Sequence, residues 1–465
     1  MATPAPKPTL LYVAMPMPMH GFNKMDPTDF GLSTTISQIC QKFKITVRPS
    51  ATGEALFITA PDKTSAKEAM AVIRQALMCK AGEKIMWQPL VLVTPPKGDA
   101  ENFRAILQQK EGTPGARPTV LPSSTDANKS AGQITTAAAT SGYKEAISKA
   151  LVNAAENMRF LPNKMRMRVK FGNLYLKEWK KGKDEYTFAD LESLVRRAGP
   201  RGTAAMDTFI GYEGIVDPLR AQLASLAAGG LQCATLSEPV HSLVFITKNL
   251  SLESVFEKVR TTGTIQANGK LPYRFSLGTI QAFHLEKRYR TVEIMSACPE
   301  NRHDWILEVS NHISTDDMTS NAVLPFNETK LSLNVKFRSD IADENFPQIN
   351  VNPAFTKSFG IENIVGKTSW TYLINSKYFV EVSMYRRWGQ NTTLPPISGV
   401  CVSMYGDSWD NVMEADDLST GPREWKDFAK QFLESDTPKC QDPYDDFLYW
   451  IHHVQGMLDE LVKDK

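Results

Sequence analysis

Short apolar runs and one helical stripe near the N-terminus predict a compact unit of strands and helices. A helix with one buried face is predicted where apolar residues recur at i, i+3, i+4 and i+7, at Ile36, Ile39, Cys40 and Phe43. Ser65 and Glu68 form a capping box that opens a second predicted helix at 66–80. Strands are predicted at residues 10–14, 44–48, 55–60 and 89–94. These elements define a first domain at residues 1–95.

The amino-acid composition changes between residues 96 and 142, where Pro, Gly, Ser, Thr and Ala dominate. Segments such as EGTPGARPTVLPSSTDANKSAG carry too few apolar side chains to form a core. We therefore predict that residues 96–142 are a flexible linker between two folded parts.

The remaining residues, 143–465, predict one large α+β domain, with a division into two subdomains near residue 263 as an alternative. A capping box of Thr187 and Asp190 opens a helix that ends at Gly199-Pro200. Further helices are predicted at 143–160, 217–229 and 444–462, and strands at 274–283, 291–297, 304–309, 331–337, 370–374, 378–385 and 399–405. Few helices connect these strands, so we expect a mostly antiparallel sheet.

Composition and charge narrow the class of protein. With 42% hydrophobic and 22% charged residues, the chain lies in the globular range. A net charge of +2 gives no overall attraction to nucleic acid or membrane. The six cysteines are widely separated and form no C-x-x-C pair, which favours reduced thiols and a cytoplasmic location. No run approaches the length of an apolar transmembrane segment, so no membrane partner is expected.

The near-neutral total hides two regions of opposite charge. Residues 159–183 contain nine Lys or Arg and a single acid, Glu178. Residues 401–465 contain fifteen acids and six bases. Any preference for a charged partner is therefore expected to be local to one of these regions.

Within the basic region, MRMRVKFGNLYLKEW predicts a β-hairpin that turns at Gly172-Asn173. Alternating runs flank the two turn residues, so residues at equal distances from the turn would face one another. One face of this hairpin is then apolar. The other face combines cations with aromatic rings, namely Arg166, Arg168, Lys170, Tyr175, Lys177 and Trp179, and is extended by Lys180 and Lys181.

Such a face favours contact with RNA, because cations neutralise phosphates while exposed rings stack on unpaired bases, at about 1–3 kcal/mol per base. Arg168 directly opposite Lys177 would be unfavourable unless an anion lay over both. Two alternatives remain open: the face is simply solvated, or it pairs with the acidic C-terminal region. In the second case the chain is a structural or adaptor protein that binds other proteins or a second copy of itself.

No motif predicts an enzyme, a cofactor or a metal site. The segment from Gly360 to Gly366-Lys367-Thr368 has five residues between its glycines, whereas a P-loop has four, and a strand follows it. Ser408 has no histidine at the spacing that a lipase-type triad requires. The seven histidines do not pair with cysteines or acids at zinc spacing. We therefore expect no catalytic residues, no cofactor and no metal.

The order strand, helix, strand, strand, helix in the first domain resembles a KH module, the small RNA-binding fold in which a GXXG loop clamps the nucleotide backbone. Here the corresponding loop is Phe30-Gly31-Leu32-Ser33, which lacks the bracketing glycines. The resemblance implies a degenerate KH-like scaffold that either holds RNA or serves packing and protein contact.

The segment MRMRVKFGNLYLKEWKK, followed by YTFADLESLVRRAGPRGTA, resembles a group of fungal proteins of unassigned function that join KH-like modules to a long C-terminal domain. This resemblance implies an intracellular, RNA-associated protein and supplies no catalytic residues. Charge and resemblance together predict a non-enzymatic RNA-binding or ribonucleoprotein-associated protein that contacts phosphates through the basic hairpin.

Overall fold

The structure, a computed structural model of the chain, describes the residues on which the following account rests. They are residues 10–16, 33–50, 55–84, 89–98, 100–109, 115–121, 137–158, 165–179, 183–211, 213–228, 234–235, 239–248, 250–260, 273–284, 289–311, 328–338, 348–374, 377–388, 397–407, 409, 432–433 and 442–463.

An N-terminal unit has the predicted order of elements. It consists of β1 (Leu11–Pro16), α1 (Ser33–Phe43), β2 (Thr46–Pro49), β3 (Ala55–Ala60) and α2 (Lys63–Lys84). The sheet is antiparallel with the order β1-β3-β2. Its core is built by alternate residues of β3 packed against one side of each helix, and contains Leu56, Ile58, Ala60, Ile39, Ala69 and Ile73.

Two details of this unit differ from the sequence-based expectation. Helix α2 begins at Lys63, and its cap is Asp62, whose carboxylate accepts hydrogen bonds from the Ser65 backbone N–H and hydroxyl at 2.8 Å each. The predicted capping box at Ser65 is therefore wrong, because an acceptor three residues earlier already satisfies that N–H. Of the loop expected to correspond to GXXG, residues 30–32 lie outside the described residues, and Ser33 begins α1.

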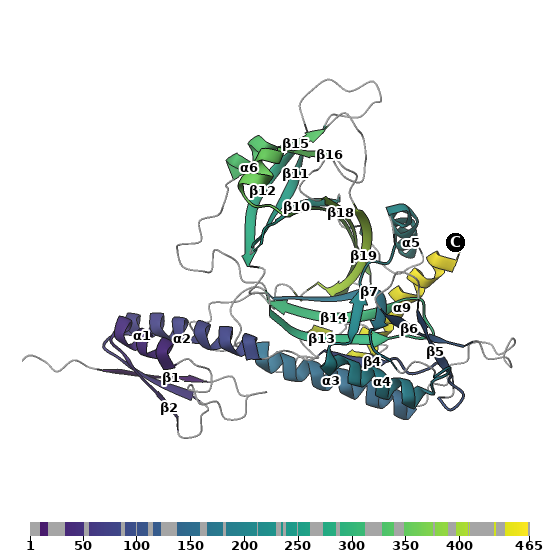
Figure 1. Cartoon of the computed structure of the whole chain (residues 1–465), viewed down its shortest axis with the longest axis horizontal. Coiled ribbons are helices and arrows are strands. Elements are labelled where there is room, and N and C mark those ends of the chain that lie inside the picture. The colour runs from purple at the N-terminus through teal and green to yellow at the C-terminus, as the bar shows by residue number, and fades with distance from the viewer. Residues whose placement is uncertain are drawn as a thin grey trace, which may run out of the picture.

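A large sheet forms the second part of the molecule and confirms the predicted α+β class. Its main path runs β12-β11-β10-β17-β18-β19-β7-β14-β13-β4, and Figure 1 shows it curving into a ring. Every pairing along this path is antiparallel except that of β4 with β13. The strands are β4 (Leu90–Val93), β7 (Met165–Leu176), β10 (Val240–Ile246), β11 (Leu250–Arg260), β12 (Tyr273–His284), β13 (Tyr289–Ala297), β14 (Asp304–Asn311), β17 (Asn363–Ile374), β18 (Tyr378–Trp388) and β19 (Ile397–Gly406).

The domain boundaries differ from the expected ones. Strand β4 pairs with β13 of the large sheet, so it does not belong to the N-terminal unit, and a boundary at residue 95 is wrong. Strands β11 and β12 pair across the segment that contains residue 263. The described residues therefore give one continuous sheet and no division there.

Part of the expected linker is also structured. β5 (Ala105–Gln109) and β6 (Ala116–Val120) pair with each other, and Ala116 of β6 also pairs with Leu176 at the end of β7. Ala105 is fully buried in a small core with Leu174 and Leu176, and Ala116, which pairs with Leu176, is also fully buried. A segment poor in apolar residues is ordered here because it docks on a core that the rest of the chain supplies. Residues 122–136 lie outside the described part.

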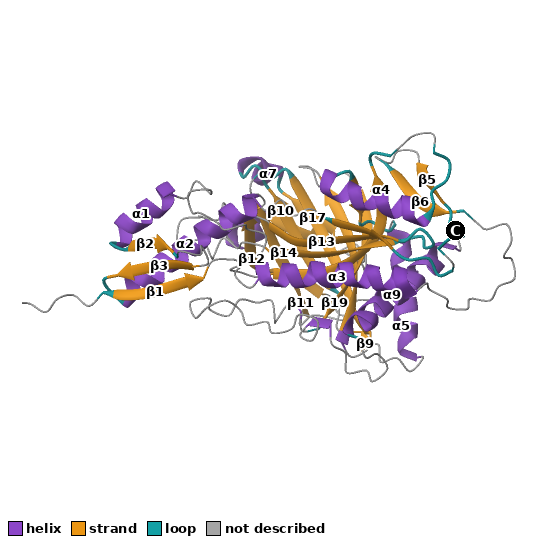
Figure 2. Ribbon diagram, turned by 90° about the horizontal axis from the view of Figure 1, so that it is seen from below, coloured by secondary structure: helices purple, strands orange, loops and turns teal. Residues whose placement is uncertain are grey.

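Helices cover the outer side of the ring. α3 (Ala137–Met158), α5 (Val216–Ala228) and α9 (Pro443–Lys463) bury apolar faces against the strands in the main core. Figure 2 shows α3 in front of the strands, with α9 and α5 toward one end of it. The predicted C-terminal helix is confirmed by α9. None of the described helices combines the length and the apolar character that a bilayer crossing requires.

The predicted start of α4 (Phe188–Arg201) is confirmed, since Thr187 caps it by accepting a hydrogen bond from the Asp190 N–H at 3.3 Å. The C-cap of this helix is Gly202, in the left-handed region at φ 64°, whereas the expected stop was Gly199-Pro200. The predicted strand 331–337 is a helix followed by a short strand. The remaining elements are β8 (Ala204–Asp207), η2 (Glu213–Ile215), β9 (Ala234–Thr235), α6 (Glu328–Asn334), β15 (Val335–Arg338), β16 (Gln348–Val351) and α7 (Pro353–Ser358).

Candidate anion-binding face

The basic segment forms one continuous strand, so the predicted hairpin is wrong. In β7, Gly172 pairs with Asp304 of β14, and the next residue, Asn173, pairs with Asp207 of β8. Each half of β7 is thus hydrogen-bonded to a different strand. The two halves therefore do not pair with each other as a hairpin. Gly172 does not form a turn. It lets the backbone of β7 approach the backbone at Asp207 closely, because a Cβ there would collide with the Asp207 carbonyl oxygen.

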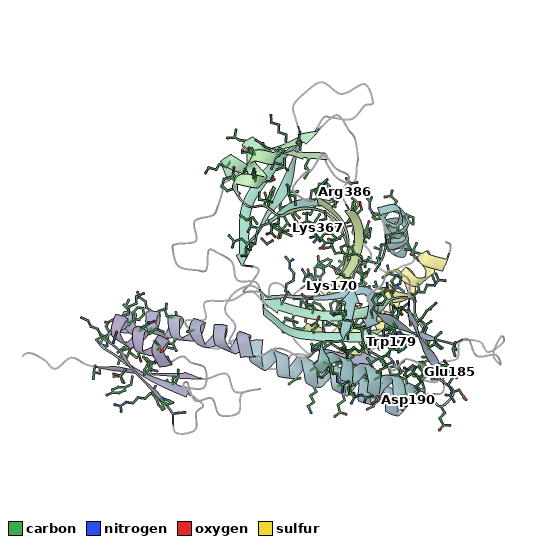
Figure 3. All side chains as sticks on the ribbon, in the orientation of Figure 1. Lys170, Trp179, Glu185, Asp190, Lys367 and Arg386 are labelled. Atoms are coloured by element: carbon green, nitrogen blue, oxygen red, sulfur yellow. The ribbon has the colours of Figure 1, made fainter. Side chains whose placement is uncertain are left out.

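A single strand places the predicted residues on different faces. Met167, Val169 and Phe171 enter the main core on the outer side. Arg166, Arg168 and Lys170 alternate with them and therefore face the inner side of the ring. Figure 3 shows Lys170 and Lys367 at the inside of the ring.

The aromatic and C-terminal members of the predicted face lie elsewhere. By alternation Tyr175 is on the face opposite Lys170, where burial raises its pKa. Lys177 is exposed just beyond the end of β7. Trp179 is half-buried and lies outside the ring in Figure 3. Lys180 and Lys181 lie outside the described residues. The combined cationic and aromatic face is therefore not formed by this segment.

Neighbouring strands bring other polar residues beside the three β7 cations. We use the name concave face for a set of inward side chains of β7, β14, β17, β18 and β19, namely Arg166, Arg168, Lys170, Glu308, Lys367, Ser369, Glu381, Ser383, Tyr385, Cys401, Ser403 and Tyr405. Their registers place Glu308 beside Arg168, Ser403 beside Lys170, and Lys367 beside Tyr385.

The cations of the β7 side make two described contacts with neighbouring strands. The Lys170 ammonium lies 3.3 Å from a carboxylate oxygen of Glu308. The Arg168 guanidinium stacks on the Tyr405 ring at 3.9 Å and also donates to the Met167 carbonyl at 2.7 Å. Arg166 has an exposed side chain at the start of this row. Arg168 and Lys170 thus contact side chains of neighbouring strands, whereas the Arg166 side chain is exposed.

Lys367 and Glu381 form the second centre of the concave face. Their Nζ and Oε1 atoms are 2.8 Å apart, and the Ser383 hydroxyl donates to the same carboxylate at 2.6 Å. The Ser369 and Ser383 hydroxyls are 3.0 Å apart. Burial alone raises the pKa of Glu381, but the Lys367 charge and these hydrogen bonds outweigh it and lower that pKa to about 2. The carboxylate is therefore ionised across the physiological range.

Electrostatic coupling joins the two centres. Burial lowers the pKa of Lys367, Tyr385 and Glu381 raise it above its usual value, and the charge of Arg166 opposes them. Arg166 and Lys367 come from β7 and β17, between which β18 and β19 lie in the sheet. The charges of these two cations from separated strands oppose each other, and an anion bound between them would relieve that repulsion.

Cys401 adds a thiol to the concave face. Burial raises the pKa of the Cys401 thiol to about 11, so the thiol is protonated at neutral pH and is a poor nucleophile. Among the described residues no group of three His, Cys, Asp or Glu could hold a metal ion. Gly366, Lys367 and Thr368 lie within β17. This arrangement is suited to binding an anion.

Three described acids of the C-terminal region pair away from the concave face. Asp442 and Asp445 both contact the Lys144 ammonium, at 2.7 and 2.6 Å. Asp459 contacts His303 at 2.8 Å. The C-terminal region reaches the basic strand through the Tyr405 ring on Arg168. Residues 410–431, which carry much of the acidic charge, lie outside the described part.

Sequence reasoning missed Lys367, Glu381, Tyr385 and Tyr405. The available signal was alternation over part of each strand: Lys367 and Ser369, then Glu381, Ser383 and Tyr385, then Cys401, Ser403 and Tyr405 stand at every second position, between buried residues. That pattern indicates a sheet with a polar inner face. It does not show which polar residues from different strands become neighbours.

Comparison with known proteins gives a family match and two distant solved structures. Residues 133–439 match the model of a family described as "Domain of unknown function (DUF7905)". No curated protein matches the sequence. The structure of the S. pombe Pct1 RNA triphosphatase aligns with 8% identity and a TM-score of 0.35, covering 71% of this chain and 97% of that one. The same enzyme in complex with the Spt5 CTD gives 9% identity, the same TM-score and the same coverage. Similarity at this level carries no inference about function.

Proposed function

Because this chain belongs to the DUF7905 family, whose description assigns no activity, we propose its function from the concave face: the protein is a non-enzymatic RNA-binding protein that holds RNA phosphates there. The phosphate ligands are the cations that converge from two parts of the sheet, Arg166, Arg168, Lys170 and Lys367. Cytoplasmic RNA is the ligand that the sequence favours.

One observation carries this proposal: the strand registers place Lys170 and Lys367 on one face of the sheet, with the exposed side chain of Arg166 on the same face. Burial lowers the Lys367 pKa, Tyr385 and Glu381 raise it, and the Arg166 charge lowers it again. Arg166 lies outside the ion pairs that occupy Lys170 and Lys367, and its side chain is exposed. A phosphate between the two cations would gain charge-assisted hydrogen bonds from both. The existing carboxylates fix the lysines in place, which lowers the entropy lost when the phosphate binds.

Phosphate contacts have a measurable signature. For single strands, the logarithm of the association constant falls with the logarithm of salt concentration, with a slope of about −0.7 per neutralised phosphate. Because such contacts read no base edges, the proposed binding is only weakly selective for sequence. We therefore expect the salt dependence of RNA binding to become shallower when a cation of the concave face is removed.

The test is a titration of a fluorescein-labelled single-stranded RNA by fluorescence anisotropy, at several salt concentrations between about 50 and 200 mM. Arg166→Gln removes the exposed cation without stranding a buried partner. Lys149→Gln is the matched control, because Lys149 is an exposed cation of α3, on the outer side of the ring. We expect weaker binding and a shallower salt slope for Arg166→Gln, and wild-type behaviour for Lys149→Gln.

Equal affinities and equal slopes for Arg166→Gln and wild type would remove the concave face from the account. Absence of RNA binding by the wild-type chain would overturn the proposal as a whole. A change of sedimentation coefficient in Arg166→Gln without any RNA binding would instead favour the adaptor alternative, in which the basic strand contacts protein.

A further inference from the structure

The small sheet of the N-terminal unit has one covered face and one open face. Val13, Leu56 and Ile58 point toward α1 and α2 and belong to the core of the unit. The opposite face carries two large aromatic side chains, Tyr12 with 75% and Phe57 with 50% of its surface exposed. Two exposed rings on one small sheet face require an explanation, because single exposed apolar residues are common and adjacent ones are not.

Strand register places the two rings next to each other. Tyr12 of β1 pairs with Thr59 of β3, and Phe57 of β3 pairs with Ala14 of β1. The rings are therefore diagonal neighbours on one face, at a separation of roughly 7–8 Å that large side chains can bridge. On its other side Phe57 pairs with Arg48 of β2, whose side chain is also exposed.

We propose that this open face is a second RNA contact, on which Tyr12 and Phe57 stack with two unpaired bases while Arg48 contacts the adjoining phosphate. Aromatic rings on an open sheet face give sequence-tolerant stacking, since every base has a π face. The described residues of the face, Tyr12, Ala14, Pro16, Thr46, Arg48, Ala55, Phe57 and Thr59, include one cation and no carboxylate. This charge complements a polyanion.

The choice of RNA as the ligand rests on the proposed function, but the open face shares no residue with the concave face. It also differs in place from the loop before α1 that the KH resemblance singled out. A protein partner that added a strand would instead pair with the backbone of an edge strand, β1 or β2, and would not depend on the two rings.

The experiment uses the full chain and a single-stranded oligonucleotide that contains 2-aminopurine, whose fluorescence is quenched by stacking. The double variant Tyr12→Ala/Phe57→Ala removes both rings. Phe57→Trp keeps a stacking surface at the same position. Leu333→Ala is the matched control, because Leu333 is 69% exposed on α6 and lies outside the N-terminal unit. The three substituted side chains, Tyr12, Phe57 and Leu333, are exposed, so little change in stability is expected.

We expect the double variant to bind at least about fivefold more weakly, since one stacked base contributes at least that factor. Its salt slope should equal that of wild type, because no phosphate contact is lost, and the 2-aminopurine quenching should disappear. Phe57→Trp and Leu333→Ala should bind as wild type does.

Wild-type affinity and quenching in the double variant would overturn the inference, even if Arg166→Gln had reduced binding and its salt slope. Conversely, loss of binding in the double variant with no effect of Arg166→Gln would uphold the open face and reject the concave one. If the double variant changed the oligomeric state in sedimentation and left RNA affinity unchanged, the face would be a contact between copies of this chain, and the RNA assignment would fail.

Discussion

Replacement of Lys367 by methionine tests the electrostatics of the concave face most directly. Lys367 and Glu381 have side-chain exposures of 22% and 18%, and their charged atoms are 2.8 Å apart. Lys367→Met keeps much of the side-chain volume and leaves the Glu381 carboxylate with the Ser383 hydroxyl and the more distant charge of Arg168. Removal of one partner from a buried pair is costly, because the other charge stays desolvated.

The magnitude follows from the pKa of Glu381. That pKa falls from 4.5 to about 2 on folding: burial opposes the shift, and Lys367 and Ser383 outweigh burial. A difference of this size corresponds to about 3 kcal/mol. Since the folded pKa is lowered, this stabilisation is fully present above pH 4.5 and is lost as the pH falls from 4.5 toward 2. Most of it depends on Lys367, so we expect the variant to lose about 2–3 kcal/mol at neutral pH.

The assay is urea unfolding of wild type, Lys367→Met, Glu381→Gln and the double variant at neutral pH and again near pH 3. In the double-mutant cycle the coupling between the two residues should be large at neutral pH and smaller near pH 3, where the ionic stabilisation is partly lost. A coupling energy below about 0.5 kcal/mol at neutral pH would refute a strong buried ion pair, because solvent-exposed ion pairs already have coupling energies of that size.

Three further predictions concern the framework. Gly172→Ala should destabilise the chain by about 1–3 kcal/mol in thermal unfolding, because its Cβ collides with the Asp207 carbonyl; an unchanged Tm would show that β8 can move away. Thr187→Ala should cost about 1 kcal/mol through loss of the α4 cap, and Thr187→Ser should restore it, whereas equal stabilities of the two variants would deny the cap. Burial raises the pKa of Asp459, but hydrogen bonds from His303, Arg302 and Asn301 lower it below 3.8 overall, so its stabilisation is present above that pH and lost below it. Asp459→Asn should therefore flatten the acid limb of the stability curve, and an identical acid limb would contradict this assignment.

The open face and the concave face differ in how far the sequence predicts them. Strand alternation around Phe57 and Arg48 is local, and a three-stranded sheet built from neighbouring segments brings these residues together with Tyr12. The concave face joins β7 to β14 and β19, which lie far along the chain. Local patterns indicate that Lys170 faces inward with Arg168, and they contain no information on which strand lies beside them.

The sequence by itself determined the α+β class, most strands of the large sheet, the cap at Thr187, the C-terminal helix and the shared face of Arg166, Arg168 and Lys170. These features follow from periodicity and capping, which act over a few residues. Only the tertiary structure decided that Gly172 continues a strand, that residues 90–93 join the large sheet and that Lys367 lies on the same concave face as Lys170. In each case the deciding partner is distant in sequence, because a strand edge is satisfied by whichever backbone the whole fold places against it.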